Sequence, residues 1–157
     1  MTIVYATPEQ LANYIAGRDL DAADPPAAPA DAGVLLRQAS TLVAEVIRAA
    51  VYDVDVDGYP TDTEKRSALA EATCVQSAAW SSNGVNPIAG RAGVKPSVAS
   101  KSLGGASVQY ASYAADAQAR SDLASGDVLI AAAWRVLDNA GMISSSVQST
   151  RRGSWRR

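Results

Sequence analysis

The stretch that decides the fold is DAGVLLRQASTLVAEVIRAAVYDVDVDGYPTDTEKRSALAEATCVQSAAWSS, residues 31–82, which reads as helix, acidic turn, helix. Apolar residues recur at three- and four-residue spacing through 31–51 and again through 62–80, the period of an α-helix with one buried side. The positions expected to be buried are Val34, Leu35, Ala39, Leu42, Val43, Val46, Ile47 and Ala50 in the first helix, and Leu69, Ala72, Cys74, Val75, Ala79 and Trp80 in the second. Two amphipathic helices joined this closely fold back on each other, so the stretch predicts an αα-hairpin.

The turn between these helices is the acidic sequence DVDVDGYPTD, residues 53–62. Gly58 supplies a backbone position free to take a positive φ, and Pro60 cannot continue a helix. Thr61 or Asp62 is the expected cap of the second helix. The sequence therefore predicts a tight turn followed by a well-defined helix start.

Composition favours one helical domain spanning residues 1–157. Hydrophobic residues make up 48% of the chain, yet there is no Phe and aromatic residues are only 6%. A core of small, closely packed residues favours thin helices over a wide sheet. The sequence has no apolar run of membrane-spanning length and no basic-then-apolar leader, so it predicts a protein made in the cytoplasm with no membrane partner.

The chain offers little for catalysis. It has no His and a single Cys, Cys74, which excludes an internal disulfide, Cys/His zinc sites and Ser-His or Cys-His catalytic pairs. Cys74 lies in the middle of a predicted helix and is expected to be a packed, inert thiol. No Gly-rich phosphate loop with its Lys is present. We therefore expect no enzyme activity and no cofactor.

Helix signals also lie at both sides of the central stretch. Thr7-Pro8-Glu9-Gln10 combines a cap, a proline in the first turn and a Gln three residues after the Thr, and Gly17 is a plausible stop. The Pro- and Ala-rich segment 21–30 predicts an extended linker. A last helix is expected over 122–140. Its cap is Ser121 or Ser125, its stop is Gly141, and its buried stripe is Leu129, Ala132, Ala133, Val136, Leu137 and Ala140.

A β-hairpin is expected between the second and last of the long helices, at about residues 97–113. Strand-like residues 97–103 and 106–113 flank Gly104-Gly105, which suits a two-residue turn. A lone two-stranded hairpin is only marginally stable in water, and a non-helical stretch of this length is too long for an ordinary loop. The sequence thus predicts an arm that protrudes and packs on another subunit.

The C-terminal tail, residues 142–157, ends in RRGSWRR. Without Arg151, Arg152, Arg156 and Arg157, the formal net charge of −2 becomes −6, so the body is acidic and the tail is basic. Three interpretations stay open: a docking peptide anchored by Trp155, a nucleic-acid-binding segment, and a solvated terminus.

The acidic turn also matches a calcium loop. Asp53, Asp55, Asp57, Gly58 and Glu64 fit the spacing D-x-D-x-D-G-x5-E, which places carboxylates around a hard cation. Two details oppose this interpretation: Pro60 removes a backbone N–H at the eighth position, and such loops usually come in pairs. The favoured expectation is an acidic turn with no metal bound, and the calcium site is the alternative.

The order of these elements resembles the head-to-tail adaptor, or head-completion, proteins of tailed bacteriophages. The resemblance covers about residues 5–145. It includes the Tyr-Asp…Asp-Gly-x-Pro-Thr-Asp turn at 52–62, the Ala-Thr-Cys-x-Gln of 72–76, the Ser-rich Gly-turn hairpin, and the last helix ending Ala-Gly-Met-Ile at 140–143. None of these motifs is catalytic, and the resemblance depends on their order.

The resemblance implies a small helical bundle with a protruding β-hairpin and extended terminal arms. Family members form a ring of twelve copies beneath the portal protein of the virion, and the ring continues the DNA channel toward a tail or stopper protein. It implies that terminal segments dock on the portal. By position alone, the docking residues here are Arg151, Arg152, Trp155, Arg156 and Arg157.

The function expected from the sequence is therefore a structural connector at the head-tail junction of a phage particle. The acidic body agrees with a channel wall that DNA passes without sequence-specific binding, because phosphate contacts require Lys or Arg. The alternatives are a calcium-binding helix-loop-helix module and a small helical nucleic-acid-binding protein that acts through its Arg-rich tail.

Overall fold

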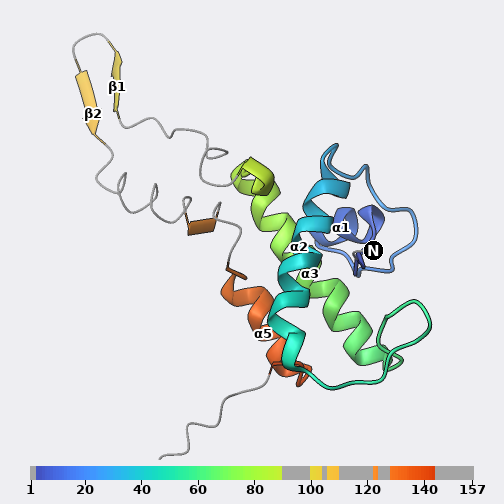
Figure 1. Cartoon of the computed structure of the whole chain (residues 1–157). Coiled ribbons are helices and arrows are strands. Elements are labelled where there is room, and N and C mark those ends of the chain that lie inside the picture. The colour runs from blue at the N-terminus through green and yellow to red at the C-terminus, as the bar shows by residue number, and fades with distance from the viewer. Residues whose placement is uncertain (1–2, 90–99, 104–105, 110–121, 124–127, 144–157) are drawn as a thin grey trace, which may run out of the picture.

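The computed structural model is mainly α-helical, with four helices packed together (Figure 1). It describes residues 3–89, 100–103, 106–109, 122–123 and 128–143. None of the helices in these ranges is both long enough and apolar enough to cross a membrane. The helices are α1 (Pro8–Ile15), α2 (Ala32–Val46), the 3-10 turn η1 (Ile47–Ala49), α3 (Thr63–Asn83) and α5 (Ala131–Asn139).

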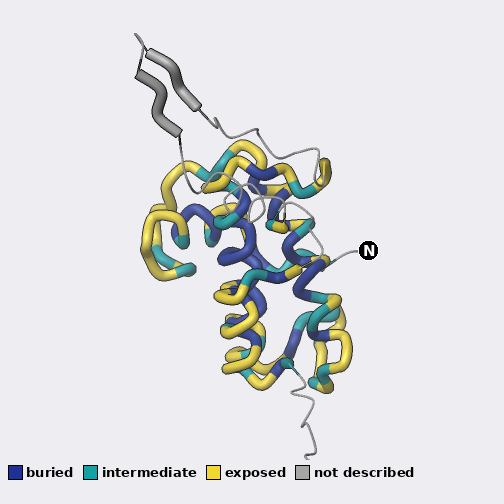
Figure 2. The backbone as a smooth tube through the Cα atoms, turned by 90° about the vertical axis from the view of Figure 1, so that its left-hand side faces the viewer, coloured by how far each residue is buried: buried dark blue, intermediate teal, exposed yellow. Residues whose placement is uncertain are grey.

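Helix α3 is the centre of the bundle. Helices α1, α2 and α5 all pack on it, so it is buried on nearly every side in its middle turns (Figure 2). The stripe predicted from the amphipathic pattern is narrower than the buried surface of α3, because neighbouring helices approach its small side chains from several directions. The buried residues of this part are Ala68, Leu69, Ala70, Ala72, Thr73, Cys74, Val75, Gln76 and Ser77.

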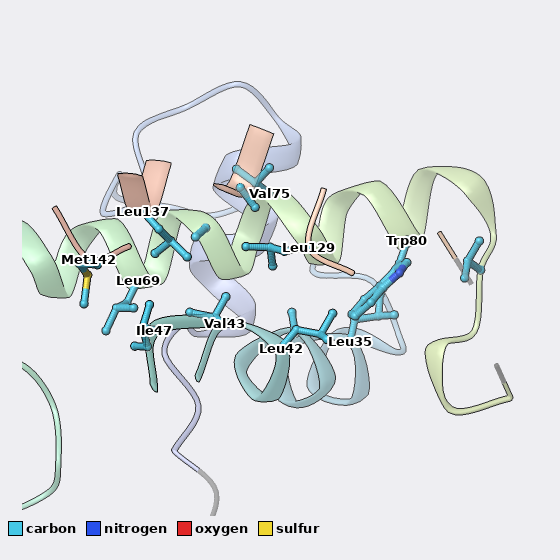
Figure 3. Packing of buried hydrophobic residues seen from close by; sticks show 14 residues of the cluster. Leu35, Leu42, Val43, Ile47, Leu69, Val75, Trp80, Leu129, Leu137 and Met142 are labelled. Atoms are coloured by element: carbon cyan, nitrogen blue, oxygen red, sulfur yellow. The ribbon is translucent and has the colours of Figure 1, made fainter. Parts of the chain in front are cut away.

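Helix α2 contributes residues to two clusters of core residues. Leu35 faces the main cluster, which α2, α3 and α5 share, and Figure 3 shows it beside Trp80 at one end of that cluster. Leu36 faces a smaller cluster with Leu11 and Cys74, between α1 and α3. The predicted stripe included Val34 and omitted Leu36. This was wrong: Val34 is 37% exposed and Leu36 is buried, because α1 covers a second side of α2.

The start of α1 confirms the capping box expected from the sequence. The Thr7 hydroxyl accepts the backbone N–H of Gln10 at 3.2 Å, and the Gln10 side chain accepts the backbone N–H of Thr7 at 3.0 Å. Inside α1, the buried Asn13 side chain donates to the carbonyls of Leu20 and Ala22, which holds the segment that follows the helix. The linker that follows, 21–30, is free of helix and strand, as predicted.

The last helix is shorter than predicted. Residues 122–123 are helical, but 128–130 are not, and α5 begins at Ala131; the expected caps Ser121 and Ser125 lie outside the described residues. Ile130 is extended because its N–H donates to the buried side chain of Gln76 at 2.9 Å. The predicted stripe is correct at Leu129, Ala133 and Leu137, but Ala132 is exposed. Gly141 ends the helix with a φ of +66°, as expected.

Two short strands lie between α3 and α5 in the sequence. Strand β1 (Ser100–Leu103) pairs antiparallel with β2 (Ala106–Gln109), with Ser100 opposite Gln109 and Leu103 opposite Ala106. Residues 90–99, 104–105 and 110–121 lie outside the described part of the chain. The protruding arm at 97–113 and the extended terminal arms therefore stay predictions.

Replacing Leu69 by Ala tests the central position of α3. Leu69 is fully buried, so we expect Leu69→Ala to lower the free energy of unfolding by about 2–5 kcal/mol, because the smaller side chain leaves a cavity. The measurement is urea denaturation followed by circular dichroism.

Val56→Ala is the matched control, because Val56 is completely exposed and its truncation is expected to change stability by less than about 0.5 kcal/mol. Equal stabilities for the two variants would contradict a core built around α3.

Candidate functional site

The predicted docking residues of the tail lie outside the described part of the chain. Arg151, Arg152, Trp155, Arg156 and Arg157 all fall in 144–157, so their assignment stays a prediction from the sequence. The features that the described residues offer are the acidic loop between α2 and α3, two surface hollows, and a set of exposed apolar side chains.

The connection between α2 and α3 is a structured loop, longer than the tight turn expected. Val54 and Pro60 form an isolated antiparallel bridge. The Asp55 N–H donates to the Tyr59 carbonyl at 2.8 Å, and the Thr61 N–H donates to the Asp53 carbonyl at 3.0 Å. Gly58 turns the chain between these bonds with a φ of +88°, which fits its predicted role.

Asp55 holds this loop together. One of its carboxylate oxygens accepts the N–H groups of Asp57 at 3.0 Å and Tyr59 at 2.9 Å. The other oxygen lies 3.4 Å from the guanidinium of Arg66, which also sits 4.8 Å from the centroid of the Tyr59 ring. The Tyr59 hydroxyl donates to the Val4 carbonyl at 3.1 Å. The loop is thus bound to the N-terminal segment and to α3.

The candidate calcium ligands are not arranged as a metal site. Among residues 3–89 and the other described ranges, no three Asp, Glu, Cys or His side chains gather closely enough to hold an ion. The Asp55 carboxylate is already used by the loop, and Glu64 lies in the first turn of α3. The structure therefore does not bring Asp53, Asp55, Asp57 and Glu64 together, and it gives the calcium-binding alternative no support.

Asp62 is the cap of α3, one of the two residues expected from the sequence. Its carboxylate accepts the backbone N–H of Glu64 at 2.9 Å and pairs with the Lys65 ammonium. The hydrogen bond from Lys65, and then the one from the Glu64 backbone, lower the pKa of Asp62 below its ordinary value. This carboxylate has a structural role at the helix start.

Cys74 is buried, as the sequence predicted. Burial, with a smaller contribution from the Glu71 carboxylate, raises the pKa of the thiol to about 12. Because only the thiolate is an effective nucleophile, the thiol is inert at neutral pH.

Two surface hollows of similar size lie at different places on the bundle. The first, of about 350 Å³, is lined by residues that include Tyr5, Asp21, Tyr59 and Arg66. The second, of about 340 Å³, is lined by residues from the N-terminal end of α2 and from the C-terminal end of α3 and the segment after it. Five of its nine lining residues have apolar side chains and three have polar ones: Asp31, Val34, Leu35, Trp80, Ser81, Gly84, Val85, Asn86 and Ile88. We call this second hollow the α2–α3 hollow.

Several large apolar side chains are exposed, and the sequence reasoning did not identify them as candidate contact residues. They are Ile15, Val34, Val51, Val54, Val56, Ile88, Val128 and Trp134. Trp134 is 44% exposed on α5. The sequence did contain a sign of this exposure, because Trp134 falls outside the predicted stripe that contains Ala133 and Leu137.

Comparisons with protein-family models, curated proteins and solved structures found no match.

We predict that calcium at millimolar concentration leaves the melting temperature unchanged and gives no binding heat in calorimetry, because the acids of the loop are not gathered around one point.

We also expect Asp55→Ala to lower the free energy of unfolding by about 1–3 kcal/mol without any metal, since it removes the acceptor of two N–H groups.

Asp53→Ala is the matched control, because the hydrogen bonds of Asp53 in this loop are accepted by its backbone carbonyl, which the substitution keeps. A calcium-dependent rise in melting temperature that both substitutions abolish would restore the calcium site.

The buried thiol gives a prediction about labelling. A thiol reagent such as Ellman's reagent at pH 8 is expected to leave the native chain unlabelled, because burial keeps Cys74 protonated and covered. In concentrated guanidinium chloride the same reagent should label one thiol per chain. Labelling of the native protein at the rate of the unfolded chain would show that the smaller cluster between α1 and α3, which contains Cys74, is open to solvent.

Proposed function

We propose that the chain is a non-enzymatic structural connector of a phage virion. It forms a ring beneath the portal protein that continues the DNA channel to the tail. The observation that carries the proposal is the order of elements: a capped short helix, a linker, two packed helices joined by the Asp-Gly loop, a strand pair, and a last helix. The phage adaptor family has this order, on which the resemblance of the sequence rests.

The exposed apolar side chains support a function in assembly. Apolar residues exposed singly are common on any protein, but Trp is enriched among the residues that dominate protein–protein contacts. Here Ile88 and Val34 lie at the α2–α3 hollow, and Trp134 lies on α5. Neighbouring copies or partner proteins would cover these groups in a ring.

In this proposal the basic tail docks on the portal, with Trp155 as its anchor and Arg151, Arg152, Arg156 and Arg157 pairing with acids of the partner. The acidic body faces passing DNA without gripping it. No feature of the described residues favours nucleic-acid binding as the main function.

The test is to co-express the chain with the portal protein of the same phage and to examine the complex by electron microscopy. We expect twelvefold rings on the portal, and we expect a chain that lacks residues 151–157 to bind the portal at least roughly tenfold more weakly, because it loses an aromatic anchor and four cations.

The matched control replaces the four arginines by Gln and keeps Trp155, which separates the charge contribution from the anchor. A chain that shows no affinity for the portal in any form would overturn the proposed function.

A further inference from the structure

We propose that copies of this chain associate head to tail, with Trp134 of one copy seated in the α2–α3 hollow of the next and Arg135 beside it facing Asp31. The inference rests on the proposed ring, and it names the two surfaces that form the ring contact. A protruding apolar group and a complementary hollow on different faces of one molecule produce such a heterologous contact, which closes into a ring when the rotation permits.

The knob is the outer side of α5 at its N-terminal end. Ala131, Trp134 and Arg135 follow helical spacing, and all three are exposed. The opposite side of the helix, with Ala133 and Leu137, is fixed in the core against α3. Trp134 is therefore held on a rigid element, so little conformational entropy is lost when it is covered.

The hole is the α2–α3 hollow. Its volume of about 340 Å³ lies at the lower end of the range of ligand pockets. Trp80 and Leu35, both fully buried in the main cluster, form its floor, while Val34 and Ile88 remain exposed at its rim. An apolar occupant would cover the two rim residues that the single chain leaves open to water.

The charges of the two surfaces are complementary. Among the described residues that line the hollow, Asp31 is the ionisable one, and the knob has Arg135 directly after Trp134. Within the described part of the chain neither side chain forms an ion pair, and Asp31 makes no side-chain hydrogen bond although it occupies the cap position of α2. A contact between copies would pair them.

Trp155 of the tail is the competing occupant of the hollow, since it too is followed by arginine. We assign the hollow to Trp134 because that side chain stands on a helix already packed in the core, so little conformational entropy is lost when it is covered. The experiment below distinguishes the two.

The test measures self-association of the full chain by sedimentation velocity and native mass spectrometry. Trp134→Ala and Ile88→Ala, on the knob and at the hollow, are expected to weaken association at least roughly thirtyfold, as for interface hot spots. Val56→Ala, which removes apolar surface at an exposed site away from both, is the matched control and is expected to have no effect. Trp155→Ala is also expected to leave self-association unchanged.

Charge reversal tests the pairing directly. Asp31→Arg and Arg135→Asp are each expected to weaken association about fivefold or more, and the double variant should recover to within about twofold of the original chain. Thermal melting of each variant controls for folding, which matters for Asp31 because it lies at the start of α2.

Cross-linking adds a readout that does not depend on stability. A short thiol-specific cross-linker should join an Asp31→Cys chain to an Arg135→Cys chain when the two are mixed. It should give no cross-linked dimer when either variant is present alone. The Glu9→Cys chain mixed with Arg135→Cys is the control, and native Cys74 stays silent because it is buried.

The outcomes separate this inference from the proposed function. Rings on the portal that tolerate Trp134→Ala and show no mixed cross-link would overturn the contact and leave the connector function in place. Loss of self-association in Trp155→Ala but not in Trp134→Ala would also overturn it and would assign the hollow to the tail. A chain that neither associates with itself nor binds the portal would overturn both.

Discussion

The physical constraint on which the structure depends is the burial of α3 on nearly all its sides. A helix surrounded in this way must carry small side chains where its neighbours come close, and its middle turns consist mostly of Ala, Ser, Thr and Cys. Two of its buried polar side chains make hydrogen bonds within the core. The Thr73 hydroxyl donates to the Leu69 carbonyl at 2.8 Å, and the Gln76 side chain accepts the Ile130 N–H. The central helix thus determines where the last helix can begin.

Two hydrogen bonds from α3 to the segment before α5 explain the main error in the expected secondary structure. Gln76 bonds Ile130, and the Trp80 indole donates to the Leu123 carbonyl at 2.9 Å. Both are long-range contacts, separated by more than forty residues in sequence, so local periodicity contains no information about them. The pattern of apolar residues at 129, 133 and 137 correctly predicted the buried side of α5 but extended the helix over 128–130. Tertiary contacts overrode local propensity there.

The features that the sequence predicted well are those fixed within a few residues. The capping box at Thr7 and Gln10, the cap at Asp62 and the glycine stops at 17 and 141 depend on short-range backbone geometry. The loop at 53–62 shows the limit of this reasoning. Its spacing matches a calcium motif, yet the Asp55 carboxylate accepts backbone N–H groups and pairs with Arg66. The spacing of the acids alone does not tell this arrangement from a metal site. The candidate site in the tail rests on sequence and resemblance alone.

The same constraint links the fold to the proposed assembly. Small side chains let three helices approach α3, but they supply little apolar surface, so the large side chains that the chain does possess matter for both folding and association. Trp80 is buried at the end of the core, where it lines the α2–α3 hollow. Trp134, on a helix whose other side is already packed, cannot turn inward without giving up Ala133 and Leu137. Its apolar surface therefore cannot be covered by repacking this helix, whereas the contact proposed above would cover it in the α2–α3 hollow of a neighbouring copy.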